Sequence, residues 1–346
     1  MTTESAAEAS PPLTVAVTGP TGDIGRSLLR VLDRNPRVGR VAAMARRPFD
    51  PAAEGLRKVE YRRADVLDAD AVAEVIAGAD VVVHLAFMIM GGAQDTTEIN
   101  LTGSRNVFTA AIDAGVARLV YASSVAAYGF GADNPPVLTE DLEPRGTRRH
   151  YYSAHKAELE LALREMLAGS DVDAYVFRPC IVAGPDALTL VETIPYVQLS
   201  EKMPGPILRA LEFMPALRPV IPDPGVPFQL VHHDDVATAM EAAVMGQGEP
   251  GVYNLAGDGT LTMADLAGAL GWYSIPVPEL AVDVAAELVA RLPFVPDEAQ
   301  WIESARRPVI MDTTRARTIL GWQPRHGARE TLEEMVRAAR SERLIR

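Results

Sequence analysis

A tyrosine and a lysine stand four residues apart, at Tyr152 and Lys156, near the start of a helical pattern over Ser153–Leu167. Side chains at this spacing lie on one face of a helix, one turn apart. An ammonium group beside a phenol favours the phenolate and lowers the pKa of the phenol from about 10 towards neutral. We therefore interpret Tyr152 as a general acid/base for a hydroxyl or carbonyl group. Tyr151 is the competing candidate, but four residues on it meets His155, a poorer cation at neutral pH.

Two serines, Ser123 and Ser124, lie at the end of an apolar run that predicts a strand over Leu119–Ser123. Hydroxyl groups at the carboxyl end of a parallel strand face the ligand crevice of an open α/β sheet. A serine in that position can bind the substrate oxygen and orient it for proton transfer. Taken alone, two serines at a strand end are an ordinary turn signal.

Three glycines follow the first apolar run, Leu13–Thr18, and precede a helical pattern over Gly25–Arg34. Their spacing, Gly-x-x-Gly-x-x-Gly, suits a pyrophosphate site: the first permits a tight turn, the second lets the backbone approach the phosphates, and the third lets the helix pack close to the strand. The helix N-terminus adds N–H groups and a partial positive charge. We predict a dinucleotide site formed by Gly19, Thr21, Gly22, Asp23, Ile24 and Gly25.

The end of the second predicted strand, Val41–Ala45, bears on the choice of dinucleotide. Arg46 and Arg47 follow it, and the first acid is Asp50. NAD sites usually place an acid here for the ribose hydroxyls, whereas an arginine accommodates the 2′-phosphate of NADP. The sequence therefore favours NADP over NAD, with Arg46 as the phosphate ligand.

Further contacts with the dinucleotide are expected after the third and fourth predicted strands, Val59–Arg62 and Val81–Leu85. Backbone at these strand ends lines the cofactor cleft of a doubly wound sheet. We assign the adenine edge to Asp65 and Val66, and the cleft to Leu85 and Ala86. His84 has no evident partner in the sequence, and we interpret it as structural.

Short apolar runs alternate with longer amphipathic stretches throughout the first half of the chain. Continuous apolar strands such as Val81–Val83 suit a parallel sheet covered by helices on both faces. The strand–helix repeat implies right-handed crossovers and an α/β, doubly wound sheet of the Rossmann type. Besides those already named, the predicted elements are a strand at Ala174–Phe177, helices at Ala69–Ala77 and Thr102–Ala114, a strand at Phe228–Val231, a helix from Asp235, and an amphipathic helix at Ala328–Leu344.

The change in character after Pro179 predicts a second region. Ten of the 26 prolines lie between Pro179 and Pro227, a density that prevents long regular elements. This stretch is either a rigid linker or an apolar wall over a site. We predict a dinucleotide-binding domain over residues 13–184, with residues 228–255 returning to it. Residues 185–227 and 256–346 form a substrate-binding or lid region with a C-terminal helix.

Composition excludes several classes of partner. The chain of 346 residues has a formal net charge of −13, which argues against nucleic acid. A single cysteine, Cys180, excludes an internal disulfide and a multi-cysteine metal site, so we expect no metal and a reducing cytoplasmic setting. The polar start, Met1–Pro12, predicts a disordered tail, and Val81–Met90 is too short to cross a membrane. We expect a small-molecule substrate, no membrane partner, and a homodimer as the oligomer to consider.

Four motifs occur together in a fixed order, and as a set they are far more specific than any one of them. They are Gly19-x-x-Gly22-x-x-Gly25, Ser123-Ser124-x-x-x-Tyr128-Gly129, Tyr152-x-x-x-Lys156 and Arg178-Pro179-x-x-x-x-Gly184-Pro185. Over roughly residues 13 to 260 the chain resembles the extended short-chain dehydrogenase/reductase family, often labelled NAD-dependent epimerase/dehydratase. The resemblance implies a Rossmann domain with a smaller C-terminal substrate region.

The resemblance also implies roles for individual residues. Ser124 matches the catalytic hydroxyl, Tyr152 the acid/base, and Lys156 its partner, which also holds the nicotinamide ribose. Asn100 falls near a structural asparagine of the family. The segment Pro179–Ala183 would border the nicotinamide, and from it we assign cofactor contacts to Pro179, Ile181 and Val182, together with Ser123 at the fifth strand. The segment at His233 resembles the return from the substrate region, and we interpret His233 as structural.

The chemistry implied is hydride transfer between a nicotinamide and a carbon that bears oxygen. Family 4,6-dehydratases place Asp-Glu after the catalytic hydroxyl, but here Val125 and Ala126 follow it. Family UDP-sugar 4-epimerases place an asparagine where this chain has Cys180–Ala183. The stretch from Pro179 to Pro227 has few basic residues, which favours a fairly apolar alcohol or ketone over a nucleotide-sugar. A sugar-nucleotide epimerase is the alternative, and a non-catalytic dinucleotide-binding protein is a third reading.

Overall fold

The computed structural model describes residues 11–89, 96–148, 150–194, 196–198, 218–278 and 308–345. Residues 1–10 of the predicted tail and residues 199–217 of the proline-rich stretch lie outside the described residues. Within the described part of the chain, no helix combines the length and apolarity that a membrane crossing needs.

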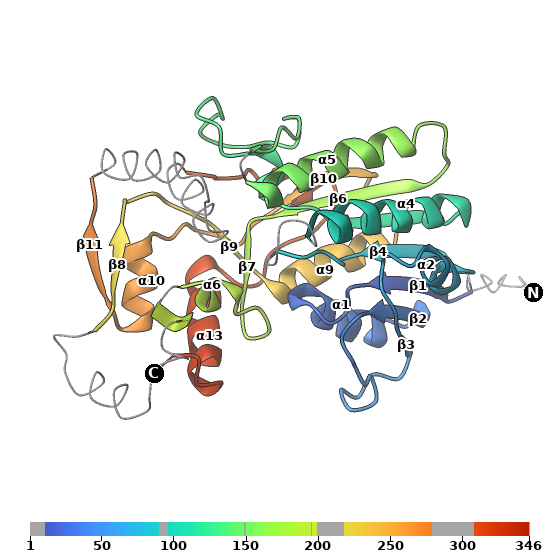
Figure 1. Ribbon diagram of the computed structural model, residues 1–346, viewed down its shortest axis with the longest axis horizontal. Helices are drawn as coiled ribbons and strands as arrows, with labels where there is room; N and C mark the ends of the chain where they lie inside the picture. Colours follow the sequence, from blue (N-terminus) through green and yellow to red (C-terminus); the bar gives the residue numbers. More distant parts are fainter. Residues whose placement is uncertain are drawn as a thin grey trace, which may run out of the picture.

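A seven-stranded sheet forms the centre of the fold, with the strand order β10-β6-β5-β4-β1-β2-β3 and every pairing parallel (Figure 1). This confirms the predicted α/β, Rossmann-type doubly wound sheet. The strands are β1 (Leu13–Thr18), β2 (Val38–Ala45), β3 (Val59–Arg63), β4 (Val81–His84), β5 (Arg118–Ala122), β6 (Asp173–Pro179) and β10 (Gly251–Leu255).

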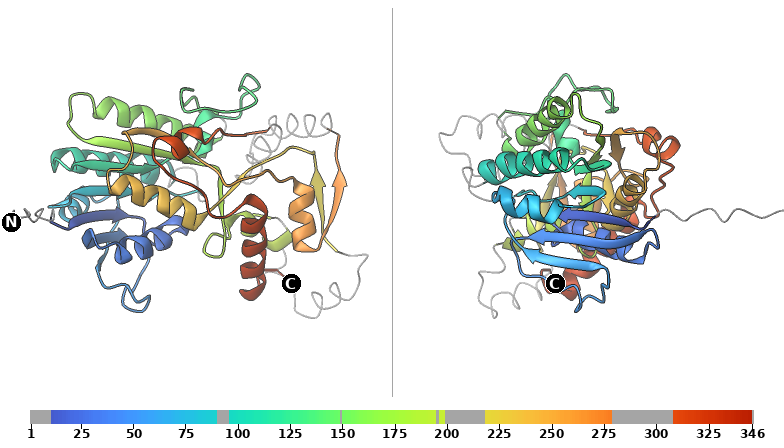
Figure 2. Two further views of the ribbon diagram at one scale, coloured as in Figure 1. Left: turned by 180° about the vertical axis from the view of Figure 1, so that it is seen from behind. Right: turned by 90° about the vertical axis from the view of Figure 1, so that its right-hand side faces the viewer.

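Helices cover both faces of the sheet, as strands that are apolar on both sides require. One face carries α2, α4 and α5, and the other carries α1 and α9 (Figures 1 and 2). Alternate residues of a strand enter different cores: Val81 and Val83 pack with α1 and α9, whereas Val82 packs with α2 and α4. These helices are α1 (Asp23–Arg34), α2 (Ala69–Ile76), α4 (Gly103–Asp113), α5 (Tyr151–Met166) and α9 (His233–Val244).

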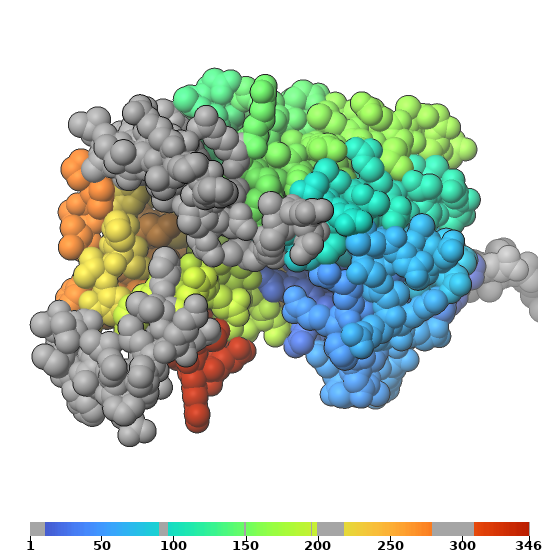
Figure 3. All heavy atoms as spheres, in the orientation of Figure 1, coloured from blue at the N-terminus to red at the C-terminus, as the bar shows by residue number. Residues whose placement is uncertain are grey.

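A third, separate core lies beyond the carboxyl ends of the strands. Leu266, Leu332 and Met335 are among its buried members, and it joins the C-terminal helix to elements that follow β6. Figure 3 shows these yellow, orange and red segments beside the blue and green sheet domain. The elements are β7 (Ile181–Ala183), α6 (Thr189–Glu192), β8 (Val220–Asp223), β9 (Leu230–His232), α10 (Met263–Leu270), β11 (Tyr273–Pro276) and α13 (Ala328–Ser341), with α12 (Thr314–Thr318) near β10.

Most predicted elements lie within three residues of their observed bounds. The clearest differences are at the ends: β2 begins at Val38 rather than Val41, and α5 begins at Tyr151 rather than Ser153. His150 caps α5 by accepting a hydrogen bond from the Ser153 N–H at 3.3 Å. Histidine is not a usual cap residue, so the helix start was placed too late.

Candidate active site

The predicted site residues follow neighbouring strands at one edge of the sheet. Thr18 pairs with Met44 on β2 and with His84 on β4, and His84 pairs in turn with Tyr121 on β5. The loops after β1, β2, β4 and β5 therefore leave the sheet side by side. In a doubly wound sheet this edge, where the crossovers diverge, is the usual place of a ligand crevice.

The three glycines of the first loop differ in what a side chain at each position would contact. A Cβ on Gly19, which has φ +74°, would lie 2.6 Å from the Ala86 nitrogen, and one on Gly25 would lie 2.6 Å from the Gly19 oxygen. A Cβ on Gly22 would meet only the Gly19 oxygen, at an ordinary 3.6 Å. Packing within the protein thus requires Gly19 and Gly25 but leaves open space beside Gly22.

The open space at Gly22 adjoins the start of α1. Gly22 is the N-cap of this helix, and no side chain caps the first-turn N–H groups. Glycine backbone next to uncapped helical N–H groups fits a pyrophosphate, which needs close approach and hydrogen-bond donors. The cradle that a Cβ would fill is the observation that makes these residues suitable for a dinucleotide.

Asp23, the first residue of α1, connects this loop to the region beyond the sheet. Its carboxylate accepts a hydrogen bond from the Thr189 hydroxyl of α6 at 3.0 Å. Burial raises the pKa of Asp23 above its usual value, although the bond from Thr189 opposes that shift. Thr21 and Ile24 flank Asp23 and Gly22 in the same loop.

Basic side chains gather after β2. Arg46 is exposed, and its Nη2 lies 3.1 Å from the Met88 sulfur. Arg63, at the end of β3, donates to the Arg46 carbonyl oxygen at 2.9 Å. Arg47 is exposed as well. Among the described residues directly after β2, arginines come first and the first carboxylate is that of Asp50. This arrangement suits an anionic group such as the 2′-phosphate of NADP.

The loops after β3 and β4 lie along the same edge. Asp65 accepts a hydrogen bond from the Leu67 N–H, and the Val66 carbonyl accepts one from the Asn106 side chain at 3.0 Å. Leu85 donates its N–H to the Thr18 oxygen at 3.0 Å, and Ala86 is the residue against which Gly19 packs. Asp65, Val66, Leu85 and Ala86 thus follow β3 and β4 at the carboxyl edge of the sheet, and their contact with a dinucleotide stays a prediction.

Asn100 fixes the segment that continues from Ala86. It is fully buried, its Oδ1 accepts from the Met88 N–H at 2.8 Å, and its Nδ2 donates to the Met88 oxygen at 3.0 Å. Asn100 belongs to a π-helical turn, Glu98–Thr102, and such turns are frequent at functional sites. This asparagine fixes the backbone of Met88, two residues after Ala86.

His84 has a structural environment. One ring nitrogen lies 2.6 Å from the Thr18 hydroxyl and the other 2.9 Å from the Ser104 hydroxyl. Burial, with the Lys156 charge nearby, lowers the pKa of His84 to about 3. The ring is therefore neutral near pH 7 and ties β4 to β1 and α4.

The proposed catalytic side chains lie at the carboxyl end of β5 and in the first turns of α5. The Ser124 side chain lies beside the phenol of Tyr152. The Ser124 oxygen also accepts the Ala126 N–H at 3.2 Å, which caps the short helix Val125–Tyr128. The two hydroxyl groups are thus placed together by the turn that follows β5 and by the first turn of α5.

Lys156 lies one turn further along α5, on the same face. Its Nζ donates to the Ala122 carbonyl oxygen at 2.7 Å and stands 3.7 Å from the centre of the Phe87 ring. The distance from Nζ to the centre of the Tyr152 ring is 5.9 Å. Burial lowers the pKa of Lys156 to about 7, against an opposing effect of Glu160.

The expected lowering of the Tyr152 pKa is wrong for this structure. Burial raises the pKa of Tyr152 above 10, and the hydrogen bond with Ser124 only partly offsets that rise. The reason is that the buried phenol loses hydration, while Lys156 stays 5.9 Å from the ring and is itself only partly charged near pH 7. In this state Tyr152 is a phenol and a proton donor.

Tyr151, the competing candidate, is engaged elsewhere. Its hydroxyl donates to the Ile89 carbonyl oxygen. His155, its partner on the helix, has a pKa lowered by burial, so it supplies little positive charge at neutral pH. Tyr151 supports the segment beside the crevice, and Tyr152 faces the serine.

Sequence reasoning missed a buried network beneath these groups. Ser123 donates to the Glu160 carboxylate, and Arg178 binds the same carboxylate through Nε at 3.0 Å and Nη2 at 2.5 Å. The Arg178 guanidinium also lies 4.3 Å from the centre of the Tyr128 ring. The spacing of Lys156 and Glu160, four residues on the same helix face, was a signal that could have found this carboxylate.

The segment after β6 borders the same edge. Pro179 ends β6, and Ile181 and Val182 lie in β7, which pairs with β9. Ile181 is exposed, Val182 is partly exposed and Pro179 is buried. Burial raises the pKa of the Cys180 thiol well above its usual value, so this side chain acts as a small buried group.

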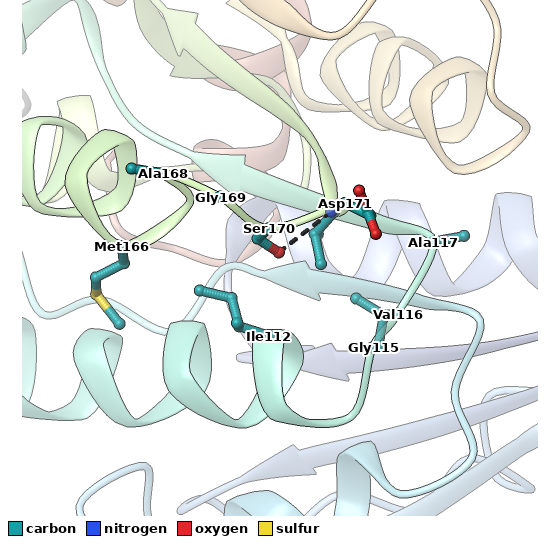
Figure 4. A pocket seen from close by; sticks show the side chains of 10 residues that line it. Ile112, Gly115, Val116, Ala117, Met166, Ala168, Gly169, Ser170 and Asp171 are labelled. Atoms are coloured by element: carbon teal, nitrogen blue, oxygen red, sulfur yellow. Dashed lines mark hydrogen bonds between the residues drawn. The ribbon is translucent and has the colours of Figure 1, made fainter.

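The other described features do not add a charged ligand site here. Arg145 binds Asp133 at 2.5 Å and Asn134 at 2.7 Å, so it is turned to its own loop; Arg149 lies outside the described residues. A pocket of about 480 Å³ lies between Ile112, Val116, Met166 and Asp171 (Figure 4). It adjoins the amino ends of β5 and β6, opposite the end that carries Ser124, and we assign it no role.

Two overlapping clusters of described residues have the composition of a metal site: His232, His326 and Glu334, and His232, His233 and Asp234. The rings of His232 and His326 stack with centres 4.0 Å apart and planes at 24°, so their nitrogen lone pairs do not converge. His232 Nδ1 accepts the Asp234 N–H, which places the proton of the neutral ring on Nε2. This geometry suits a packed stack and does not suit a bound ion.

Comparisons with known proteins identify the family and the fold of the chain. A model of the NAD dependent epimerase/dehydratase family matches residues 15–256. An uncharacterized protein of Mycobacterium tuberculosis is 27% identical over 335 residues, 94% of this chain and 84% of that protein. Human 3 beta-hydroxysteroid dehydrogenase type 7 is 34% identical over 168 residues, 44% of each chain. The dTDP-glucose 4,6-dehydratase DesIV of Streptomyces venezuelae, solved with NAD and TYD bound, has the same fold: TM-score 0.71, 22% identity, 96% of this chain and 98% of that one.

Proposed function

The chain belongs to the NAD-dependent epimerase/dehydratase family of extended short-chain dehydrogenases/reductases, and we propose that it is an NAD(P)-dependent oxidoreductase that interconverts a ketone and a secondary alcohol. The observation that carries this proposal is the placement of Ser124 beside Tyr152, with Lys156 on the next turn of α5 and bonded to the end of β5. A donor, an acid/base and a cation are the groups that polarise a carbonyl and move its proton.

We assign the cofactor to the crevice edge. Gly19, Thr21, Gly22, Asp23, Ile24 and Gly25 would cradle the pyrophosphate, Asp65 and Val66 the adenine, and Leu85, Ala86, Ser123, Pro179, Ile181 and Val182 the nicotinamide half. The nicotinamide supplies or accepts the hydride when it is bound. The arginine cluster at Arg46 and the lack of an acid after β2 favour NADP over NAD.

The role of each catalytic side chain follows from its protonation. In reduction, Tyr152 gives its phenol proton to the carbonyl oxygen, which its raised pKa allows. Ser124 donates a second hydrogen bond to the same oxygen and keeps it in line with the phenol. Lys156 would hold the nicotinamide ribose, and its positive charge would stabilise the phenolate that remains on Tyr152 after proton donation.

The surroundings of Tyr152 favour a substrate with little charge. Phe87 lies edge-on to the Tyr152 ring at 5.4 Å, and His150 at 6.3 Å. Burial lowers the pKa of His150 to about 4, so this ring is neutral near pH 7. An aromatic, uncharged wall suits an apolar ketone better than a nucleotide-sugar, and the similarity to a hydroxysteroid dehydrogenase supports the same class. We propose that residues 185–227 and 256–346 supply the rest of this substrate region.

A substrate panel tests the proposal. Purified protein is mixed with NADPH or NADH and a set of apolar ketones, and with NADP⁺ or NAD⁺ and the matching alcohols. We expect net NADPH consumption with at least one ketone. Conversion of a nucleotide-sugar to its epimer without net consumption of reduced cofactor would instead establish the sugar-nucleotide epimerase.

A further inference from the structure

Glu160 is a buried carboxylate that the proposed reaction does not itself use. Its side chain is 3% exposed and that of Arg178 is 1% exposed. Buried charges are costly, and a buried pair is no general source of stability. An acid in this position therefore calls for an explanation in terms of what it contacts.

The carboxylate contacts two parts of the site at once. It accepts a hydrogen bond from the hydroxyl of Ser123, the residue directly before Ser124. It also lies one helical turn after Lys156, on the same face of α5. Through Arg178 it reaches the Leu142 carbonyl oxygen at 3.2 Å and the face of Tyr128. Glu160 thus joins α5, the turn after β5 and the end of β6.

The other groups around Lys156 bring no negative charge. Phe87 and the neutral ring of His84 lie on the β4 side, and Tyr121 lies on β5 with its ring centre 5.1 Å from Nζ. Burial raises the pKa of Tyr121 well above 10, and Tyr152 is likewise a neutral phenol. Among the described residues, Glu160 is the charged group that acts on Lys156 and opposes the effect of burial on its pKa.

We propose that Glu160 is a positioning residue of this site: its buried charge keeps the Lys156 ammonium protonated, and its bonds to Ser123 and Arg178 hold the serine turn in place. This inference rests on the proposed function for its catalytic consequence, but the charge state of Lys156 is measurable without any substrate. Because the chain contains few lysines, the titration of Lys156 can be measured on its own.

The chain has three lysines, Lys58, Lys156 and Lys202. A Lys58→Arg/Lys202→Arg background leaves Lys156 as the single lysine, and ¹³Cε-lysine labelling then reports its titration by NMR. In this background we expect Glu160→Gln to move the midpoint of Lys156 down by about one pH unit, because a nearby opposite charge is lost. The matched control is Glu158→Gln, on the same helix but in an exposed pair with Arg105, and it should leave the midpoint unchanged.

A second variant guards against a folding defect, since Glu160→Gln leaves Arg178 buried without its carboxylate. Glu160→Met/Arg178→Met removes both charges and refills the space with apolar atoms. A downward shift is expected in this double variant as well, smaller than in Glu160→Gln because the Arg178 cation is removed together with the carboxylate, and the basic limb of the pH profile for ketone reduction should move with it. Ser123→Ala tests separately whether the bond to Glu160 holds the turn that carries Ser124. We expect this variant to lower kcat and to leave the Lys156 midpoint unchanged.

An unchanged Lys156 midpoint in both charge-removing variants would overturn the proposal. A shifted midpoint in a protein that reduces no ketone would support the role of Glu160 towards Lys156 while rejecting the proposed function, so the two failures are distinguishable.

Discussion

Lys156 donates a hydrogen bond from Nζ to the carbonyl oxygen of Ala122 at 2.7 Å, which ties helix α5 to the last residue of strand β5. The contact places the ammonium group at the carboxyl edge of the sheet, beside the turn that carries Ser124. It also explains how a lysine can be buried: one of its three donors is satisfied by backbone, and the Phe87 ring lies 3.7 Å away.

Replacing Tyr152 with phenylalanine should remove proton transfer and leave the fold intact. We expect kcat for ketone reduction to fall at least about a hundredfold, with cofactor affinity nearly unchanged. Steady-state kinetics and fluorescence titration with NADPH measure the two effects. Tyr151→Phe, which loses the bond to the Ile89 oxygen, is the control and should retain most of its activity. Equal activity of Tyr152→Phe and wild type would contradict the assigned role.

Alanine substitutions should separate the two kinds of glycine in the first loop. Gly22→Ala meets no close protein atom, so we expect a stability loss of about 1 kcal/mol or less but at least roughly tenfold weaker cofactor binding. Gly19→Ala would place a Cβ 2.6 Å from the Ala86 nitrogen, at φ +74°, and should cost about 2 kcal/mol or more. Chemical unfolding and cofactor titration give both quantities. Unaltered cofactor binding by a folded Gly22→Ala would argue against the cradle.

Arg46 should decide between the two dinucleotides. We expect Arg46→Ala to weaken NADPH binding roughly tenfold or more, through loss of a charged hydrogen bond, and to leave NADH binding unchanged. Arg40→Ala is the control, because that exposed arginine, on β2 itself, binds Glu60 instead. If wild type binds NADH more tightly than NADPH, the assignment of Arg46 is incorrect.

Acid should destabilise the protein before its carboxylates become protonated. The pKa of His84 is about 3 in the folded chain, below the ordinary 6.5, so the unfolded chain takes up a proton that the folded chain does not. Stability from this residue is fully present above pH 6.5 and is lost as the pH falls towards 3, by about 2 kcal/mol at pH 5. His150 acts in the same direction.

Urea unfolding at pH 7 and pH 5 measures this loss. His84→Gln should unfold more easily at pH 7, because its bonds to Thr18 and Ser104 are altered, but its stability should change less between the two pH values. A pH dependence identical to that of wild type would show that His84 is not the group responsible.

The sheet could be predicted because its strands are continuous apolar runs separated by amphipathic helices. The same pattern placed Gly19, Ala86 and Ser124 at one edge, since strand ends in a parallel sheet share a direction. Strand β10 was not identified as a separate element, because its sequence, Gly251–Leu255, is short and mixed. Its place beside β6 depends on long-range pairing that local patterns do not report.

The site was harder to predict wherever burial decides the outcome. The spacing of Tyr152 and Lys156 indicated their shared helix face, but the pKa of Tyr152 depends on how much water the fold removes. The partner of Glu160, Arg178, is on a different element and is joined to it only through the folded core. Arg178 was visible as a motif residue, whereas its role as a counter-charge was not.

The most direct measurement follows the hydride itself. The protein is incubated with NADPH deuterated at C4 of the nicotinamide and with a ketone from the panel, and the product alcohol is examined by mass spectrometry and NMR. The proposed function predicts one deuterium at the carbinol carbon, one NADP⁺ formed for each alcohol, and at least about a hundredfold less product with Tyr152→Phe. Absence of deuterium from the alcohol, or product formation that survives Tyr152→Phe unchanged, would contradict it.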